Sequence, residues 1–120
     1  MTALNADGPI TQMSVEELAT HLASADPATL QLIDVREPHE WEIVHLEGFE
    51  LLPLSQFESW SGDICQRFDP QRETIVLCHH GMRSLRMCDW LVSQGFQAVK
   101  NVMGGIDAYA LRVDPSLRQY

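Results

Sequence analysis

The sequence alternates short apolar segments with segments of helical periodicity, and this alternation constrains the fold more than any other feature. Residues 74–78, TIVLC, are largely apolar and β-branched on both faces, which is typical of a strand buried in a parallel sheet. Further strands are expected at residues 30–36, 49–54 and 98–102. No Asn-Gly or similar hairpin signal lies between these strands. The pattern therefore predicts an α/β fold in which a parallel sheet carries helices on both faces.

Helical periodicity recurs between the predicted strands. We expect helices at residues 14–24, 38–45, 55–60, 84–96 and 106–112. Ser14 and Glu17 have the spacing of a capping box, and Gly95 is placed to end the fourth helix. Residues 61–73 are predicted to form a polar loop. The chain is thus expected to consist of a flexible tail, residues 1–9, and one domain, residues 10–120.

The charge of the chain limits its partners. The net charge is −9 and Lys100 is the only lysine, so there is little from which to build the basic face that binding to nucleic acid requires. Anionic membranes are disfavoured for the same reason. No apolar run approaches the roughly 20 residues of a bilayer-spanning helix, and residues 1–12 lack the pattern of a secretory signal. We therefore expect a soluble, cytoplasmic protein with no nucleic-acid or membrane partner.

Three cysteines, Cys65, Cys78 and Cys88, are present. An odd number without a secretory signal argues against a disulfide framework. Cys88 lies on the apolar face of the helix at 84–96 and is predicted to be a packing residue. His79 and His80 follow Cys78 directly, but no C-x-x-C or H-x-x-x-H spacing accompanies them. The sequence therefore predicts no metal site.

Polar residues follow two of the predicted strands. Asp34 and Arg36 stand at the carboxyl end of the strand at 30–36, and Cys78 stands at the carboxyl end of the strand at 74–78. Ligands of open α/β sheets bind at this edge of the sheet. The two clusters are therefore expected to lie at one site.

The segment from Cys78 to Arg83 reads C-H-H-G-M-R and opens directly into a helix. Consecutive N–H groups of such a loop form an anion-binding nest, and the helix adds its positive end. Gly81 allows the backbone to turn with a positive φ. Arg83 is a cation at the unfavourable end of the helix, so it requires an anion, either a ligand or an acidic side chain. These features predict a reactive thiolate in an anion-binding loop; the directions of the two histidine side chains stay open.

At these residues the chain resembles the single-domain rhodaneses, sulfurtransferases whose active loop reads C-x-x-G-x-R. The matching elements are LIDVREPHEWEIVHLEG, IVLCHHGMRS and NVMGGIDAYA, in the family's order and over roughly residues 10–112. Two departures are Val44, where many members have glycine, and Tyr109, where tryptophan is usual. The resemblance implies a five-stranded parallel sheet with helices on both faces.

The resemblance also implies a chemistry. Cys78 would accept a sulfane sulfur as a persulfide, and Asp34 and Arg36 would support the site. The persulfide would be held by the loop residues His79, His80, Gly81, Met82 and Arg83. The donor would be thiosulfate or a small-molecule or protein persulfide, the acceptor a thiol or cyanide, and no cofactor would be required.

Two other functions are compatible with this fold. A phosphatase of the cell-cycle dual-specificity type has a longer C-x5-R loop, whereas four residues separate Cys78 from Arg83 here; an arsenate reductase is a more remote variant. A non-catalytic rhodanese-like regulatory module typically lacks the cysteine, which this chain retains. Sulfur transfer is therefore the favoured hypothesis.

Overall fold

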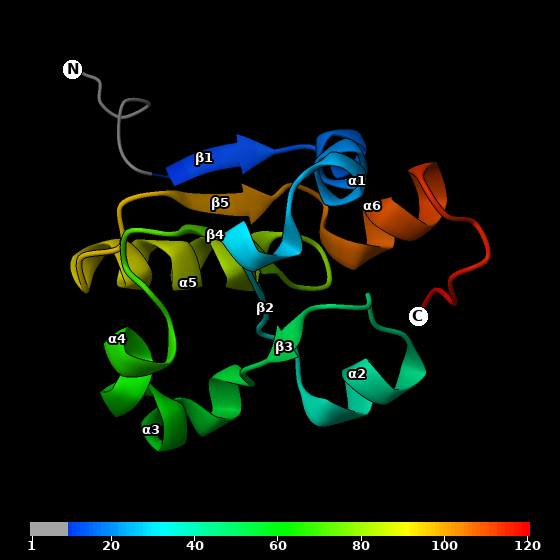
Figure 1. The fold of residues 1–120 in the computed structure, drawn as a ribbon. Helices are drawn as coiled ribbons and strands as arrows, with labels where there is room; N and C mark the ends of the chain where they lie inside the picture. The colour runs from blue at the N-terminus through cyan, green and yellow to red at the C-terminus, as the bar shows by residue number, and fades with distance from the viewer. Residues whose placement is uncertain (1–9) are drawn as a thin grey trace.

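Five parallel strands form one sheet in the order β1-β5-β4-β2-β3, in a computed structural model that describes residues 10–120 (Figure 1). The strands are β1 (Ile10–Met13), β2 (Leu30–Asp34), β3 (Glu50–Leu51), β4 (Glu73–Leu77) and β5 (Val99–Val102). The predicted parallel α/β sheet is confirmed. The predicted tail, residues 1–9, lies outside the described residues.

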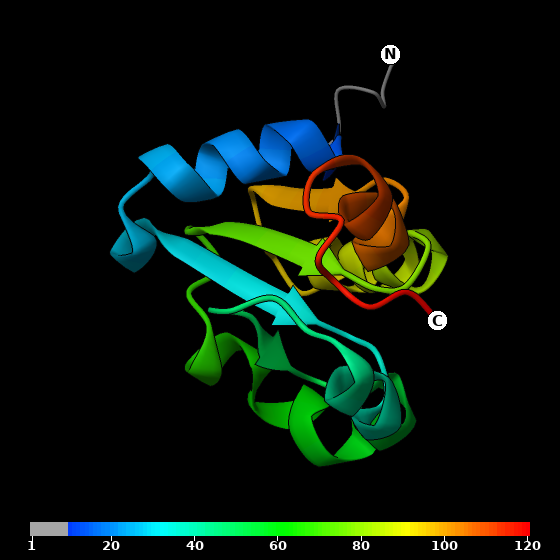
Figure 2. The same cartoon turned by 90° about the vertical axis from the view of Figure 1, so that its right-hand side faces the viewer.

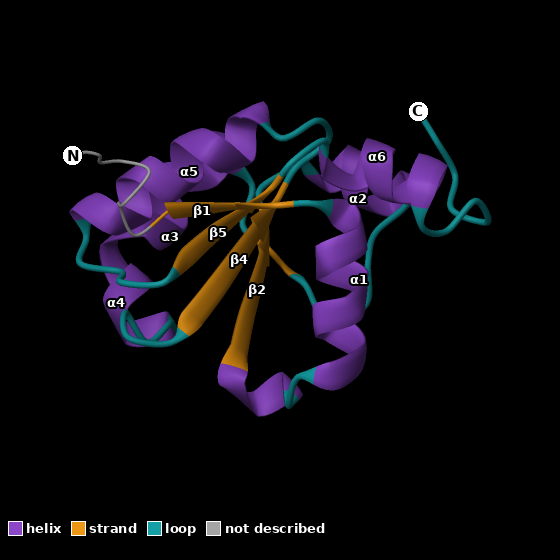
Figure 3. Ribbon diagram, turned by 90° about the horizontal axis from the view of Figure 1, so that it is seen from above, coloured by secondary structure: helices purple, strands orange, loops and turns teal. Residues whose placement is uncertain are grey.

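Helices cover both faces of the sheet, as Figure 3 shows from above. The α-helices are α1 (Val15–Ser24), α2 (Pro38–Ile43), α3 (Phe57–Trp60), α4 (Ile64–Arg67), α5 (Met82–Ser93) and α6 (Gly105–Arg112). Single turns of 3₁₀ helix occur at Pro27–Thr29, Leu54–Gln56 and Ser61–Asp63. Helices α1 and α6 lie on one face, and α3, α4 and α5 lie on the other (Figure 3).

The alternation of side chains along β4 divides the core between the two faces. Ile75 and Leu77 pack with residues of α1 and α6, whereas Val76 and Cys78 pack with residues of α3, α4 and α5. Successive side chains of a strand point to opposite faces, so a strand buried on both sides is apolar throughout. This explains the continuous apolar run and places Cys78, the first residue after β4, at the carboxyl end of a central strand.

The predicted helix ends are confirmed in two places. The side chain of Ser14 accepts a hydrogen bond from the N–H of Glu17 at 3.1 Å, and the Glu17 carboxylate accepts one from the N–H of Ser14 at 2.8 Å. Gly95 has φ +100° directly after the C-cap of α5. The beginning of α1 and the end of α5 are therefore set by local side-chain and backbone chemistry.

Two elements differ from the sequence prediction. Strand β1 was not expected, because Thr11 and Gln12 are polar; it is an edge strand paired only with β5, and Met13 is its only buried residue. Residues 61–73 were expected to form a loop, but they include α4. Ile64 and Phe68 are buried there in the core on the α5 side of the sheet, and their packing stabilises this short helix. The helix is too short to show a helical period in the sequence.

Within residues 10–120, no helix combines the length and the apolar character needed to cross a membrane.

Candidate active site

The loop between β4 and α5 encloses the sulfur of Cys78. The thiol is 1% exposed, its Sγ accepts a hydrogen bond from the N–H of Gly81 at 3.0 Å, and it lies 3.2 Å from Oγ of Ser84. Gly81 has φ +102° and is the N-cap of α5, so the chain turns back toward the sulfur there. The loop therefore directs an N–H group and the beginning of a 12-residue helix toward Sγ.

A chain of buried polar side chains continues from the sulfur. Ser84 Oγ donates to Oδ1 of Asn101 at 2.5 Å, and Nδ2 of Asn101 donates to the carbonyl of Gly81 at 3.2 Å and to Oε1 of Gln12 at 2.9 Å. A carbonyl only accepts hydrogen bonds, so its contact with Asn101 fixes the orientation of the amide. The single hydroxyl proton of Ser84 is therefore used on Asn101, and a neutral Cys78 thiol donates to Ser84.

Ser84 and Asn101 were not identified from the sequence. Ser84 directly follows Arg83, and Asn101 is a buried polar residue inside β5 with 2% exposure. A polar residue within an apolar strand is an informative signal, because its burial requires hydrogen-bond partners. The partners themselves belong to other elements and are set by tertiary packing.

The N-terminus of α6 holds the loop from the other side. The N–H of Ile106 donates to the carbonyl of Cys78 at 2.9 Å, and the N–H of Asp107 donates to the carbonyl of His79 at 3.1 Å. Gly105 has φ +63°, and a Cβ atom at this position would lie 2.5 Å from the Cys78 carbonyl oxygen and closer still to the carbonyl of His79. The loop and α6 are thus packed backbone against backbone.

We expect Gly105→Ala to destabilise the protein, because the methyl group meets rigid backbone atoms of Cys78 and His79 at a positive φ. A loss of about 1–3 kcal/mol is the scale for such strain. Chemical denaturation measures this loss. Gly62→Ala is the control, because a methyl group at that position would meet no atom of another part of the described structure within 4 Å. Equal behaviour of the two variants would contradict the expectation.

Arg83 is neutralised by an acidic residue from α2. Its Nη1 lies 2.7 Å from Oε2 of Glu40, and its Nη2 lies 2.9 Å from Oε1. This bidentate pair raises the pKa of Arg83 and, mainly through the hydrogen bonds from Arg83, lowers the pKa of Glu40 to about 2. The expected anion for Arg83 is therefore a side chain of the protein. Both terminal nitrogens of Arg83 are engaged by Glu40.

Glu40 should make stability depend on pH in acid. Its pKa is lowered from 4.5 to about 2 in the folded state, so its contribution is fully present above about pH 4.5 and is lost as the pH falls through about 2. We expect Glu40→Gln to reduce the loss of unfolding free energy over this interval, as measured by denaturant titration at several pH values. The exposed residue Glu58 provides the control variant, Glu58→Gln. A slope unchanged by Glu40→Gln would contradict the assignment.

Asp34 and Arg36 form an ion pair with both side chains fully buried. Nη2 and Nε of Arg36 lie 2.8 and 3.1 Å from Oδ2 of Asp34. The remaining donors of Arg36 reach the carbonyls of Glu40 and Val44 at 3.3 and 2.8 Å and the hydroxyl of Tyr120 at 2.9 Å. The pair thus anchors α2, the helix that supplies the partner of Arg83.

The two histidines of the loop lie differently. His79 is sandwiched between the rings of His80 and Tyr120, each with a centroid separation of 3.8 Å. Burial is the main cause that lowers the pKa of His79. The side chain of His80 is 63% exposed. The chain after α6 turns back toward the beginning of α2 (Figure 2), and the Tyr120 hydroxyl donates to Oε1 of Glu40 at 3.0 Å.

Glu40 and Tyr120 were also missed at the sequence level. Glu40 is the third residue of α2, which begins at Pro38. At this position a glutamate is explained by a capping box with Glu37, and the structure contains that capping box. Nothing in the sequence around Tyr120 distinguishes it. Both residues gain their place at the site from the packing of α2 and of the last segment against the loop.

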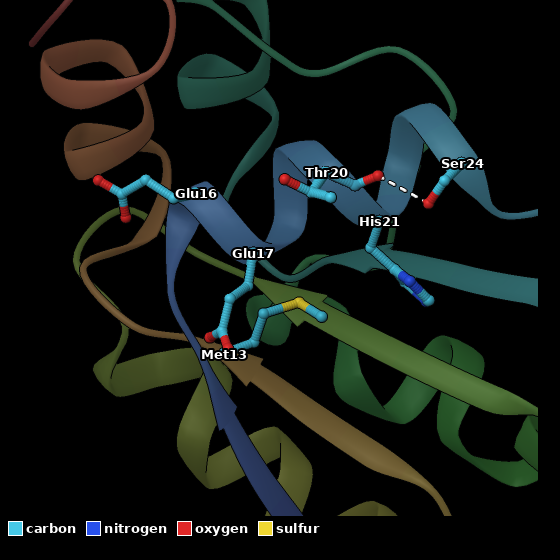
Figure 4. A pocket seen from close by; sticks show the side chains of 6 residues that line it. All are labelled: Met13, Glu16, Glu17, Thr20, His21 and Ser24. Carbon is cyan, nitrogen blue, oxygen red and sulfur yellow. Dashed lines mark hydrogen bonds between the residues drawn. The ribbon is translucent and has the colours of Figure 1, made fainter.

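A groove of 290 Å³ lies beside the loop. It is lined by Gln12, His80, Gly81, Met82, Leu85, Asn101, Met103 and Gly104. Met82 is 69% exposed and Met103 is 44% exposed, so the entrance to the loop is bordered by apolar surface. A second hollow of 390 Å³ lies along α1, where Met13, Glu17 and His21 are among its lining residues (Figure 4). No residue of the loop lines that second hollow, whereas His80, Gly81 and Met82 of the loop line the groove.

The other two cysteines lie in different surroundings. Burial raises the pKa of Cys88 to about 12, and this thiol is completely buried in the core. Cys65 is exposed, and its Sγ is 3.6 Å from the carbonyl of Gln94. Within residues 10–120, no N–H group donates to the sulfur of Cys65 or Cys88, whereas that of Gly81 donates to Cys78. Cys78 is therefore the thiol whose surroundings suit an anionic sulfur.

Comparison with known proteins identifies relatives of the chain. The model of the rhodanese-like domain family matches residues 14–112. The chain is 49% identical over 115 residues to Rhodanese-like/PpiC domain-containing protein 12, chloroplastic, of Arabidopsis thaliana, covering 93% of this chain and 38% of the plant protein. It is 29% identical over 92 residues to thiosulfate sulfurtransferase GlpE of Pseudoalteromonas translucida, covering 77% of this chain and 84% of that protein.

Solved structures give the same result for the fold. The crystal structure of a rhodanese-like domain protein from Staphylococcus aureus superposes with a TM-score of 0.73 at 24% identity, over 92% of this chain and 98% of that one. The family match spans both strands that carry the polar clusters, the loop at Cys78 and the helix that holds it. The chain therefore belongs to the rhodanese-like domain family.

Proposed function

We propose that the protein is a sulfurtransferase that carries a sulfane sulfur as a persulfide on Cys78. The observation that carries this proposal is the enclosure of the Cys78 sulfur by a loop whose Gly81 N–H points at it, at the start of α5. Such a site stabilises a thiolate and then the outer sulfur of a persulfide through N–H groups and the helix dipole. Sulfurtransferase names among the relatives support the same reaction class.

The reaction consists of two displacements. The Cys78 thiolate attacks the sulfane sulfur of the donor; a new S–S bond forms, and the electron pair of the broken bond leaves with the remainder of the donor. That remainder is sulfite when the donor is thiosulfate and a thiolate when it is a persulfide. An acceptor thiolate or cyanide then attacks the outer sulfur, and the electron pair returns to Cys78. Such a sequence gives ping-pong kinetics.

Ser84 adapts to the charge of the sulfur. The neutral thiol donates to Ser84 Oγ while Ser84 donates to Asn101. Once the thiol loses its proton, rotation of the Ser84 hydroxyl allows it to donate to the thiolate, which has become an acceptor only. Arg83 acts in this reaction through Glu40, which ties the first turn of α5 to α2.

Mass spectrometry tests the proposal directly. After incubation with a sulfane donor and removal of the excess, we expect the intact chain to gain one sulfur atom that is lost on addition of cyanide. Peptide mapping should locate it on the peptide containing Cys78. Sulfur located on Cys65, or no added sulfur while turnover continues, would overturn the proposal.

A phosphatase activity is expected to be negligible. Four residues separate Cys78 from Arg83, and both terminal nitrogens of Arg83 donate to Glu40, so the loop offers a short ring and a guanidinium already paired with a carboxylate. Release of the phenol from an aryl phosphate measures this activity. A rate comparable to that of sulfur transfer would contradict the assignment.

Insertion of one glycine after His80 should weaken sulfur transfer, because the N–H groups then diverge.

The partners follow from the same proposal. The donor is a small molecule or a protein that carries a sulfane sulfur, and the acceptor is a thiol. The groove bordered by Met82 and Met103 provides an apolar approach to the loop for a molecule larger than thiosulfate. The cytoplasmic location expected from the sequence stays a prediction.

A further inference from the structure

Three side chains that can bind metals converge beside the loop. One ligand atom each from His79, His80 and Asp107 lies within 4.8 Å of the other two. Nε2 of His80 is 3.8 Å from Oδ2 of Asp107. The prediction of no metal site rested on the spacing of ligands that are close in the sequence. Asp107 belongs to α6, far from His79 and His80 in the sequence, so that spacing could not reveal it.

His79 lacks a partner for one of its ring nitrogens. Its Nε2 is shielded from solvent and has no hydrogen-bond partner among the residues described. A shielded polar atom without a partner is costly, commonly by about 1–3 kcal/mol. An imidazole nitrogen that makes no hydrogen bond is free to serve as a metal ligand.

The backbone already holds the three residues together. The N–H of Asp107 donates to the carbonyl of His79 at 3.1 Å, so a backbone hydrogen bond joins α6 to the loop beside these side chains. Nε2 of Gln119 lies 3.5 Å from Oδ1 of Asp107, and the ring of Tyr120 stacks on His79 at 5°. The side chain of His80 packs against His79 on one side but is 63% exposed, so it has space to rotate.

We propose that His79, His80 and Asp107 bind a divalent transition-metal cation of the zinc class. Two imidazole nitrogens and one carboxylate oxygen are ligands that Zn²⁺ accepts at about 2.0–2.2 Å, and a three-residue set leaves a fourth position open. Ligand atoms around such an ion lie roughly 3.3 Å apart in tetrahedral geometry, which rotation of His80 and small shifts of its neighbours can provide. The net charge of −9 favours a cation over an anion at this surface.

Cys78 is not one of the ligands. Its sulfur is 1% exposed and faces the N–H of Gly81 and the hydroxyl of Ser84, whereas Asp107 contacts the loop through the carbonyl of His79. The proposed site therefore has nitrogen and oxygen ligands only. This property separates it from binding to a cysteine thiolate, which Zn²⁺ and Co²⁺ also favour.

Titration of the reduced full chain with Co²⁺ and with Zn²⁺ tests the proposal. We expect one site per chain by calorimetry, and a visible Co²⁺ spectrum without the intense thiolate-to-metal charge-transfer band. His80→Ala and Asp107→Asn should each weaken binding by at least about tenfold. His39→Ala, which removes an exposed histidine of α2, is the matched control and should leave the affinity unchanged.

Several results would overturn the proposal. These are the absence of saturable binding, binding that persists in both His80→Ala and Asp107→Asn, and a charge-transfer band that disappears in Cys78→Ser. Circular dichroism verifies that the variants fold; the Asp107 backbone N–H, which holds the loop, is retained in Asp107→Asn. Binding is measured without a sulfur donor, so failure here leaves the proposed sulfur transfer untouched.

Discussion

Cys78→Ser is expected to reduce kcat/KM for sulfane sulfur transfer by roughly a thousandfold or more, to the background rate. A serine hydroxyl is far less acidic than a thiol and cannot form a persulfide, so the first displacement has no nucleophile. The substitution is nearly isosteric, and the hydrogen bonds from Gly81 and to Ser84 have oxygen partners in place of sulfur. A loss of activity with unchanged thermal unfolding therefore reports chemistry rather than folding.

Cys65→Ser and Cys88→Ser provide the matched controls. Cys65 is exposed and outside the loop, and Cys88 is buried with its pKa raised to about 12, so neither thiol is suited to attack a sulfane sulfur. We expect both variants to retain kcat/KM within a few-fold. If turnover survives in Cys78→Ser and is lost in either control, the assignment of the persulfide to Cys78 is wrong.

Asp34→Ala is expected to lower the free energy of unfolding by about 3–5 kcal/mol. The substitution leaves the guanidinium of Arg36, whose side chain has 0% exposure, without its carboxylate in the interior of the protein. The cost is the desolvation of an uncompensated buried charge rather than the loss of a favourable pair. Urea denaturation monitored by tryptophan fluorescence measures it.

Glu16→Ala is the control for this prediction. Glu16 pairs with Arg112 at 2.8 Å, the same separation as in the buried pair, but the two side chains are 52% and 57% exposed. An exposed pair contributes about 0–1 kcal/mol. The double variant Asp34→Leu with Arg36→Met removes both charges and should recover part of the loss. If Asp34→Ala lowers the free energy of unfolding no more than Glu16→Ala does, the unpaired buried charge of Arg36 does not destabilise the protein as expected.

The parts of the structure that the sequence predicts are those with a local cause. The apolar run at residues 74–78, the capping box at Ser14 and the glycine that ends α5 each act within a few residues, and each is found where it was expected. The position of Cys78 at the end of a central strand follows from that strand and from the helix after it. Local pattern thus predicts the loop and the position of Cys78 together.

The parts that it does not predict depend on contacts between distant segments. Glu40 reaches Arg83, and Asp107 reaches His79, only after α2 and α6 have packed against the same loop. An acidic residue on a polar helix face is common, so its sequence surroundings do not show which cation it will meet. Strand β1 is missed for a related reason, because an edge strand with one buried residue has no strong apolar pattern.

The contact between the loop and α6 has a consequence for the synthesis of the protein. A ribosome that has released the chain only as far as β5 has already produced Cys78, Gly81 and Ser84, but not the N–H groups of Ile106 and Asp107 that fix the loop carbonyls. Chains emerge from the N-terminus, so the loop is fixed last, by a segment that appears after the whole sheet. The loop around Cys78 can therefore reach its final geometry only after α6 has been synthesised and has packed against it.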